Sequence, residues 1–116
     1  MRRTETYGRP FVSDVFGRLG SRAARIGAPV DYRLVEDLAD NPGNYKMYLF
    51  TNSLLNDPSV SRAVKKLREK DCMIVWTYAP GYVSYTGNSV SSMKELTGME
   101  FERCPDGMDS KIICAD

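Results

Sequence analysis

The sequence of 116 residues contains no histidine. Histidine is the most frequent general base at neutral pH and the usual partner of a serine or cysteine nucleophile. Its absence therefore excludes the common catalytic triads. A glycine-rich phosphate loop is also missing, since Gly17 and Gly20 lie inside a helical pattern and follow no predicted strand. We expect the chain to have no catalytic residues and no cofactor.

Cysteine is scarce, and its three occurrences, Cys72, Cys104 and Cys114, form no closely spaced pair. An odd number of widely separated cysteines suits neither a disulfide scaffold nor a zinc site. We expect reduced thiols, no metal site and a cytoplasmic location.

Long apolar runs and an excess of one charge are missing as well. The longest apolar stretch is residues 73–76, whereas a membrane helix needs about 20 residues. No apolar run follows the charged first residues, so a signal peptide is not predicted. Lys and Arg number 16 and Asp and Glu 15. Lys65, Lys66 and Arg68 fall on a predicted helix, where we expect a solvated face. The sequence predicts neither a nucleic-acid partner nor a membrane partner.

What is present is an alternation of helix and strand patterns. The clearest helix begins at Asp57 and Pro58, and another is capped by Asn88 or Ser89 and ended by Gly98. A helix is also predicted over residues 10–26, and a helical turn or loop over 36–40 followed by a tight turn at 41–44. Strands are predicted over residues 30–35, 45–51, 72–78, 99–104 and 111–114.

This order predicts one α/β domain over residues 1–116, with residues 1–9 either disordered or forming an edge segment. The strands at 45–51 and 72–78 are apolar without clear alternation, which is typical of parallel strands covered on both faces. We therefore expect an open, mainly parallel sheet with helices on both sides. Because the chain opens with a helix, we expect the sheet to lack the central strand that usually comes first.

In open parallel sheets, ligands bind beyond the carboxyl ends of the strands. The loops after residues 51 and 78 occupy this position, and the second is rich in tyrosine, whose ring and hydroxyl suit a sugar or a partner surface. The alternative is that these aromatic side chains only pack the core and the loop. The candidate ligand- or partner-binding residues are Thr51, Asn52, Tyr78, Pro80, Gly81, Tyr82 and Tyr85.

Several segments, in this order and spacing, resemble a known family. They are residues 45–52 (Tyr-Lys-Met-Tyr-Leu-Phe-Thr-Asn), Asp57 with its basic helix, residues 74–82 (Ile-Val-Trp-Thr-Tyr-Ala-Pro-Gly-Tyr) and residues 95–98 (Glu-Leu-Thr-Gly). Together they are similar to the middle, or trimerisation, domain of family-42-type β-galactosidases and related bacterial glycosidases. The resemblance extends over about residues 11–104, and it implies a flavodoxin-like sheet related to class I glutamine amidotransferases.

The resemblance also implies a role. In amidotransferases the loop after the corresponding strand carries a nucleophilic cysteine, whereas Ala79, Pro80 and Gly81 stand near that position here. The glycosidase carboxylates belong to a separate barrel domain that is not in this chain. We expect a non-catalytic oligomerisation module whose partner is a second copy. If the first strand is missing, the sheet must rearrange unless residues 4–8 or another chain fills its place. We expect self-association through the sheet, and strand exchange is one route.

Two alternatives remain open. A carbohydrate- or small-molecule-binding module would use the loops after Thr51 and Tyr78. A glutamine-amidotransferase-like enzyme would need Cys72 or Cys104 as its nucleophile, and the lack of histidine argues against it.

Overall fold

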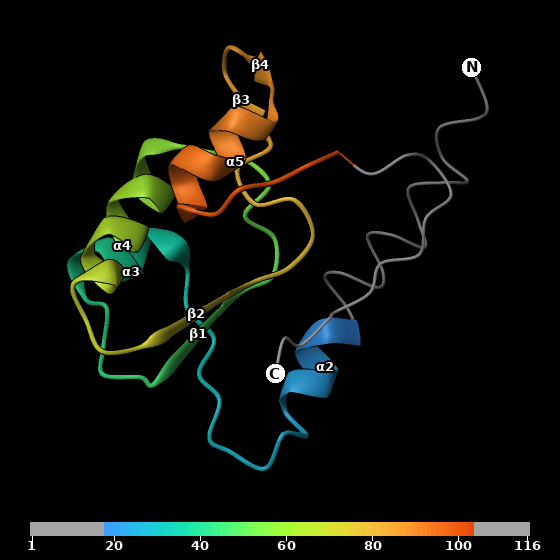
Figure 1. Cartoon of the computed structure of the whole chain (residues 1–116). Coiled ribbons are helices and arrows are strands. Elements are labelled where there is room, and N and C mark those ends of the chain that lie inside the picture. The colour runs from blue at the N-terminus through green and yellow to red at the C-terminus, as the bar shows by residue number, and fades with distance from the viewer. Residues whose placement is uncertain (1–17, 104–116) are drawn as a thin grey trace, which may run out of the picture.

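The computed structural model describes residues 18–103 (Figure 1). These residues form a small α/β arrangement, which confirms the predicted fold class at that level. None of the helices in this part of the chain combines the length and apolar character needed to cross a membrane. The elements in chain order are α2 (Leu19–Ala23), α3 (Val35–Asp40), β1 (Met47–Phe50), α4 (Pro58–Arg68), β2 (Met73–Trp76), β3 (Val83–Ser84), β4 (Gly87–Asn88) and α5 (Val90–Thr97).

The strands β1 and β2 pair in parallel, from Met47 opposite Met73 to Phe50 opposite Trp76. Helix α4 makes the crossover between them, as a parallel pair requires. Strands β3 and β4 form a separate antiparallel hairpin of two residues each. Within residues 18–103 each sheet therefore has only two strands.

Helix α4 begins where the sequence predicts. The Asp57 carboxylate accepts hydrogen bonds from the backbone N–H groups of Ser59 (2.7 Å) and Val60 (3.1 Å), and Pro58 occupies the first turn. Helix α5 also follows its prediction. The Ser89 hydroxyl accepts from the Ser92 N–H at 3.1 Å, and Gly98 ends the helix in a left-handed conformation.

The core lies between the β1–β2 sheet and the helices on one side of it (Figure 1). The sheet contributes Tyr48 and Phe50, and the Trp76 ring stacks on Phe50 with centroids 4.5 Å apart. The helices contribute apolar side chains that are buried almost completely: Leu38 and Ala39 of α3, Val60, Ala63, Val64 and Leu67 of α4, and Leu96 of α5.

The opposite face of this sheet is open, and we call it the open face: Met47, Leu49, Met73 and Val75. Their neighbours along each strand point to the core, because side chains alternate between the two faces of a strand. Met47, Leu49 and Met73 are 44%, 38% and 62% exposed. The expectation of helices on both faces, and of strands buried on both faces, is therefore wrong for the described residues. Helices α3, α4 and α5 lie together on the core side, and α2 contributes no buried residue.

Other expectations are corrected or lie outside the described residues. Residues 30–34 form no strand, and Val35 already begins α3, so the predicted strand at 30–35 is wrong. The helical turn at 36–40 is confirmed as part of α3, whereas residues 41–44 form no assigned turn and contain only a bend at Asn44. The first helix stops at Ala23, and residues 99–103 form no strand. Residues 1–17, residue 104 and the strand at 111–114 lie outside the described part of the chain.

Two basic side chains of α4 tie the helices together, which corrects the expectation that they only face solvent. The Lys66 ammonium donates to the Ala39 carbonyl at the end of α3. The Arg68 guanidinium donates to the Leu96 carbonyl near the end of α5 at 2.7 Å. Both bonds satisfy carbonyls in a last helical turn, where helices leave such groups without partners. The C-terminal half of α4 is therefore held by polar as well as apolar contacts.

The Asp57 cap leads to a test of stability. Substituting Asp57→Ala is expected to lower the free energy of unfolding by about 1 kcal/mol, because two backbone N–H groups lose their acceptor. The Ser59 hydroxyl and the N–H groups of Val60 and Ser59 also hold the pKa of Asp57 below its ordinary value. The stabilisation from the charged form is thus present above the ordinary pKa and is lost as the pH falls through the lower folded-state pKa.

Urea unfolding of the natural chain, Asp57→Ala and Asp57→Asn across acidic pH measures this effect. Asn caps helices as well as Asp does, so Asp57→Asn should retain most of the stability at neutral pH and lose the acidic dependence. A cap with no role would leave all three proteins equally stable at every pH.

Candidate functional site

The loops at the carboxyl ends of β1 and β2 lie together, as the parallel topology predicts. We call them the strand-end loops: residues 51–57 after β1 and residues 77–89 after β2. Three backbone hydrogen bonds join them: Gly81 N–H to Ser53 O (2.7 Å), Val83 N–H to Leu54 O (2.9 Å) and Asn56 N–H to Val83 O (2.8 Å). A parallel bridge also links Leu55 and Val83. The two loops are therefore one connected unit.

Thr77 joins the two loops where they leave the sheet. Its N–H donates to the Phe50 carbonyl at 3.1 Å, and its hydroxyl donates to the Thr51 carbonyl at 2.9 Å. Thr77 thus binds two consecutive carbonyls, those of Phe50 and Thr51, at the end of β1. These bonds fix the ends of β1 and β2 relative to each other.

The predicted site residues differ in how much surface they offer to a ligand. Tyr78 is 67% exposed and Tyr85, at the tip of the β3–β4 hairpin, is 80% exposed. Asn52 is also exposed, whereas Thr51 and Tyr82 are half-buried. The carbonyls of Thr51 and Tyr82 accept hydrogen bonds within the loops, from the Thr77 hydroxyl and the Ser89 N–H.

Pro80 and Gly81 are buried, so they offer little surface to a ligand or partner. Gly81 has a φ of +69°, and a Cβ atom built there would lie 2.9 Å from Cδ2 of Leu96 in α5. Glycine is therefore required twice at this position, by the backbone conformation and by the close approach of the helix. Gly81 therefore brings the loop against α5.

Tyr78 has a φ of +61°, the only positive value at a non-glycine residue among residues 18–103. A left-handed backbone at an aromatic residue costs about 1–2 kcal/mol. Such strain persists where the surrounding structure fixes it, and it concentrates at functional sites. The strain coincides with an exposed aromatic ring at the end of β2.

Tyr45, which precedes β1, makes a hydrogen bond to a carboxylate. The Tyr45 hydroxyl donates to Oδ2 of Asp31 at 2.7 Å, and this hydrogen bond raises the pKa of Tyr45. Tyr48 is ordered by its own bond, from its hydroxyl to the Pro42 carbonyl at 2.8 Å. These contacts fix the turn into β1 and lie at the opposite end of the strand from the candidate site.

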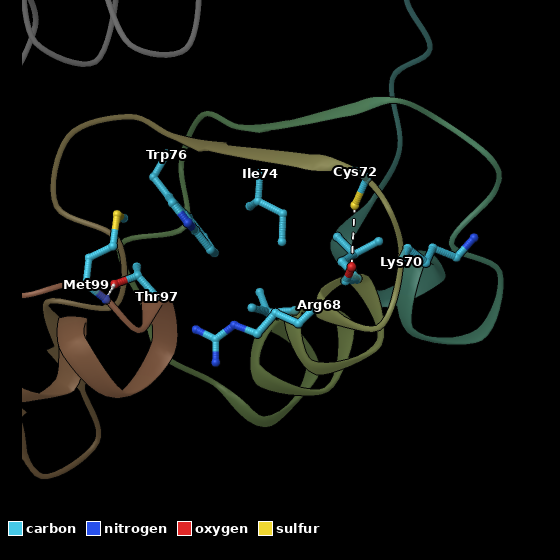
Figure 2. A pocket seen from close by; sticks show the side chains of 9 residues that line it. Arg68, Lys70, Cys72, Ile74, Trp76, Thr97 and Met99 are labelled. Atoms are coloured by element: carbon cyan, nitrogen blue, oxygen red, sulfur yellow. Dashed lines mark hydrogen bonds between the residues drawn. The ribbon is translucent and has the colours of Figure 1, made fainter. Parts of the chain in front are cut away.

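The structure also contains a cavity that the sequence did not reveal. It has a volume of about 320 Å³ and lies under β2, between that strand and the ends of α4 and α5 (Figure 2). Figure 2 shows Ile74 and Trp76 directed from β2 toward α4, with Arg68 on the facing side. The lining residues are Val64, Leu67, Arg68, Lys70, Cys72, Ile74, Trp76, Thr97 and Met99.

The cavity lining is mixed, because apolar side chains of α4 and β2 share it with the polar groups of Arg68, Lys70 and Thr97. The Cys72 thiol is half-buried and donates to the Leu67 carbonyl at 3.4 Å, so it packs as a structural thiol. None of the lining residues belongs to β1 or α3. The cavity therefore lies on the outer side of β2, away from its partner strand. The apolar run at residues 73–76 predicts a strand that is buried on both faces. A strand of that kind leaves no space beside it, so the sequence gives no sign of the cavity.

The exposed tyrosines of the strand-end loops are suited to binding a ligand or a partner. Among residues 18–103 no group of three Cys, Asp or Glu side chains is placed to hold a metal ion. Comparison with protein-family models, with curated proteins and with solved structures finds no match for this chain. The surfaces suited to contact a ligand or a partner are the exposed tyrosines of the strand-end loops, the open face and the outer side of β2.

The contact between Gly81 and α5 leads to a second test. Gly81→Ala is expected to lower the free energy of unfolding by about 2–4 kcal/mol, from left-handed strain and overpacking against Leu96 together. Gly98→Ala is a matched control, because its φ is +75° but its nearest neighbour is the flexible end of Arg68. This control should lose only about 1–2 kcal/mol. Thermal or urea unfolding measures both, and equal losses would contradict the close packing at Gly81.

Proposed function

We propose that this chain is a non-catalytic association module, in which a second copy of the chain contacts the β1–β2 sheet. The observation that supports this proposal most is that, within residues 18–103, the parallel sheet has two strands and is covered on one face only. Parallel sheets are normally covered on both faces, and two strands alone are too few for a stable sheet. The open face supports the proposal because three of its four apolar side chains are more than one-third exposed.

The unit β1–α4–β2 is the repeating element of a flavodoxin-like sheet, and we propose this fold type for the domain. Its resemblance to the middle domain of bacterial glycosidases points the same way, since that domain serves association. The proposal includes no catalytic role, because the sequence has no histidine.

A second copy is a suitable partner on electrostatic grounds. The net charge of the chain is +1, so copies repel each other little. The residues of the open face are all uncharged, and the nearest ion pair, between Lys46 and Asp71 at 3.6 Å, satisfies both charges at the start of the two strands. An apolar surface of this kind is typical of the centre of a protein interface.

Light scattering across a micromolar dilution series tests this function. The expected mass at high concentration is a multiple of 13.1 kDa that falls to one copy on dilution. Val75→Lys should weaken the association by about tenfold or more, because an unpaired ammonium would be desolvated at an apolar contact. Tyr85→Ser is the control, because Tyr85 is exposed at the hairpin tip, away from the sheet. A single copy at all concentrations would overturn the proposed function.

A second function is favoured by one observation, the strained and exposed Tyr78. In this alternative the strand-end loops bind a carbohydrate, with the Tyr78 ring stacked on the sugar and Asn52 as a hydrogen-bonding partner. The backbone strain is then retained for the orientation of the ring.

Titration with lactose, followed by calorimetry and by the fluorescence of the single tryptophan, Trp76, tests this alternative. Tyr78→Gly should abolish a saturable signal while leaving the fold as stable or more stable by about 1 kcal/mol, since glycine relieves the strain. Tyr32→Gly, at a residue that is 70% exposed outside the loops, is the matched control and should leave binding unchanged. A natural chain that gives no saturable signal would exclude lactose as a ligand.

A further inference from the structure

The outer edge of β2 presents backbone groups at alternate residues. The N–H of Met73 donates to the Lys46 carbonyl at 2.8 Å, and that of Thr77 donates to the Phe50 carbonyl at 3.1 Å. Odd-numbered residues of β2 therefore direct their backbone groups toward β1. Because successive residues of a strand point to opposite sides, Ile74 and Trp76 direct their N–H and C=O groups to the outer edge. Within residues 18–103 no strand pairs there.

This edge also lacks the features that usually protect a strand from pairing. β2 reads Met-Ile-Val-Trp, with no lysine, no proline and no bulge. Beneath its outer side lies the cavity of about 320 Å³ that β2 shares with α4 and α5 but not with β1 (Figure 2). A strand added at the normal spacing of about 4.8 Å would place its inward side chains over this cavity.

We propose that β2 pairs antiparallel with β2 of a second copy, about a twofold axis that passes beside Val75. The inference rests on the proposed function and gives it a specific contact. The positions of the free groups determine the register, because residues that exchange hydrogen bonds must both direct their backbone groups to the shared edge. Ile74 then lies opposite Trp76 of the second copy, and Trp76 lies opposite its Ile74.

The same register gives the chain self-complementarity. A twofold axis relates the two Ile74–Trp76 pairs, so both copies use one surface and the assembly closes as a dimer. The inward Ile74 and Trp76 of each copy extend the apolar layer over the cavities, and the two Val75 side chains meet on the open face. The result is a four-stranded sheet in the order β1, β2, β2, β1.

This geometry can be tested by crosslinking. The two Val75 residues form a non-hydrogen-bonded pair, whose Cα atoms are about 4.5 Å apart, within the range of a disulfide. Val75→Cys is introduced into a chain carrying Cys72→Ala, Cys104→Ser and Cys114→Ser, and mild oxidation is followed on a non-reducing gel. Leu49→Cys in the same background is the matched control, because Leu49 lies on the same face of β1, three strand spacings from its symmetry mate.

The expected result is a crosslinked dimer for Val75→Cys, formed about tenfold or more faster than for Leu49→Cys. A mass of four copies with the same crosslinking preference also supports the inference, since two such sheets can stack through their open faces. If the natural chain associates but Leu49→Cys crosslinks faster or equally fast, the edge pairing is wrong and the proposed function stands. If the natural chain stays a single copy, both are wrong.

A second measurement needs no substitution. Trp76 is the only tryptophan, and the proposed contact covers it. Its emission should shift to longer wavelength on dilution, with the same midpoint as the loss of mass in light scattering. Association with no change in Trp76 emission would overturn the edge pairing, even if the cysteine-substituted chain failed to fold.

Discussion

The packing of α4 against the inner face of the β1–β2 sheet is the contact on which the described structure depends. Val60, Ala63, Val64 and Leu67 are all at most 4% exposed, and they meet Tyr48 and Phe50 of the sheet. Ala63 has no side chain beyond Cβ, so backbones approach closely at the centre of this contact. The same helix binds its neighbours with polar groups, through Lys66 to α3 and Arg68 to α5. Helix α4 therefore joins the core, the sheet crossover and both flanking helices.

Local signals explain which elements the sequence could predict. Asp57 and Pro58, Ser89 and Gly98 mark helix ends through bonds to residues within four positions, so their roles are readable without tertiary structure. The joining of the strand-end loops was also predictable, because parallel strands bring their carboxyl ends to one edge. The open face was not predictable. Met73 and Val75 are as apolar as buried residues, and only the positions of other elements decide whether a face is covered. The strand predicted at residues 30–35 is wrong for the same reason, because a strand forms only where another strand is placed to pair with it.

The candidate site shows a similar division. The exposed side chains of Tyr78 and Tyr85 fit the expectation of aromatic residues in a loop. Pro80 and Gly81, residue types that are common in surface turns, are instead buried, and Gly81 lies against α5. Arg68 differs from its expectation in the opposite direction. A basic residue on a helix predicts a solvated side chain, whereas Arg68 lines a cavity and binds the Leu96 carbonyl. For Gly81 and for Arg68 the role of the residue depends on α5. This helix follows both residues in the chain, and no local sequence pattern describes how it docks.

The separation of β1 and β2 along the chain has a consequence for how the protein folds. The hydroxyl of Thr77 and the Thr51 carbonyl that it binds belong to residues 26 positions apart in the sequence. These residues follow β2 and β1, so the strands cannot pair until the chain between them has folded back. Helix α4 forms through local hydrogen bonds and does not require this closure, whereas parallel pairing does. Until then the segment Met-Ile-Val-Trp is accessible along both edges of its backbone. An apolar strand segment that is exposed in this way is prone to aggregation while a chain is incompletely folded.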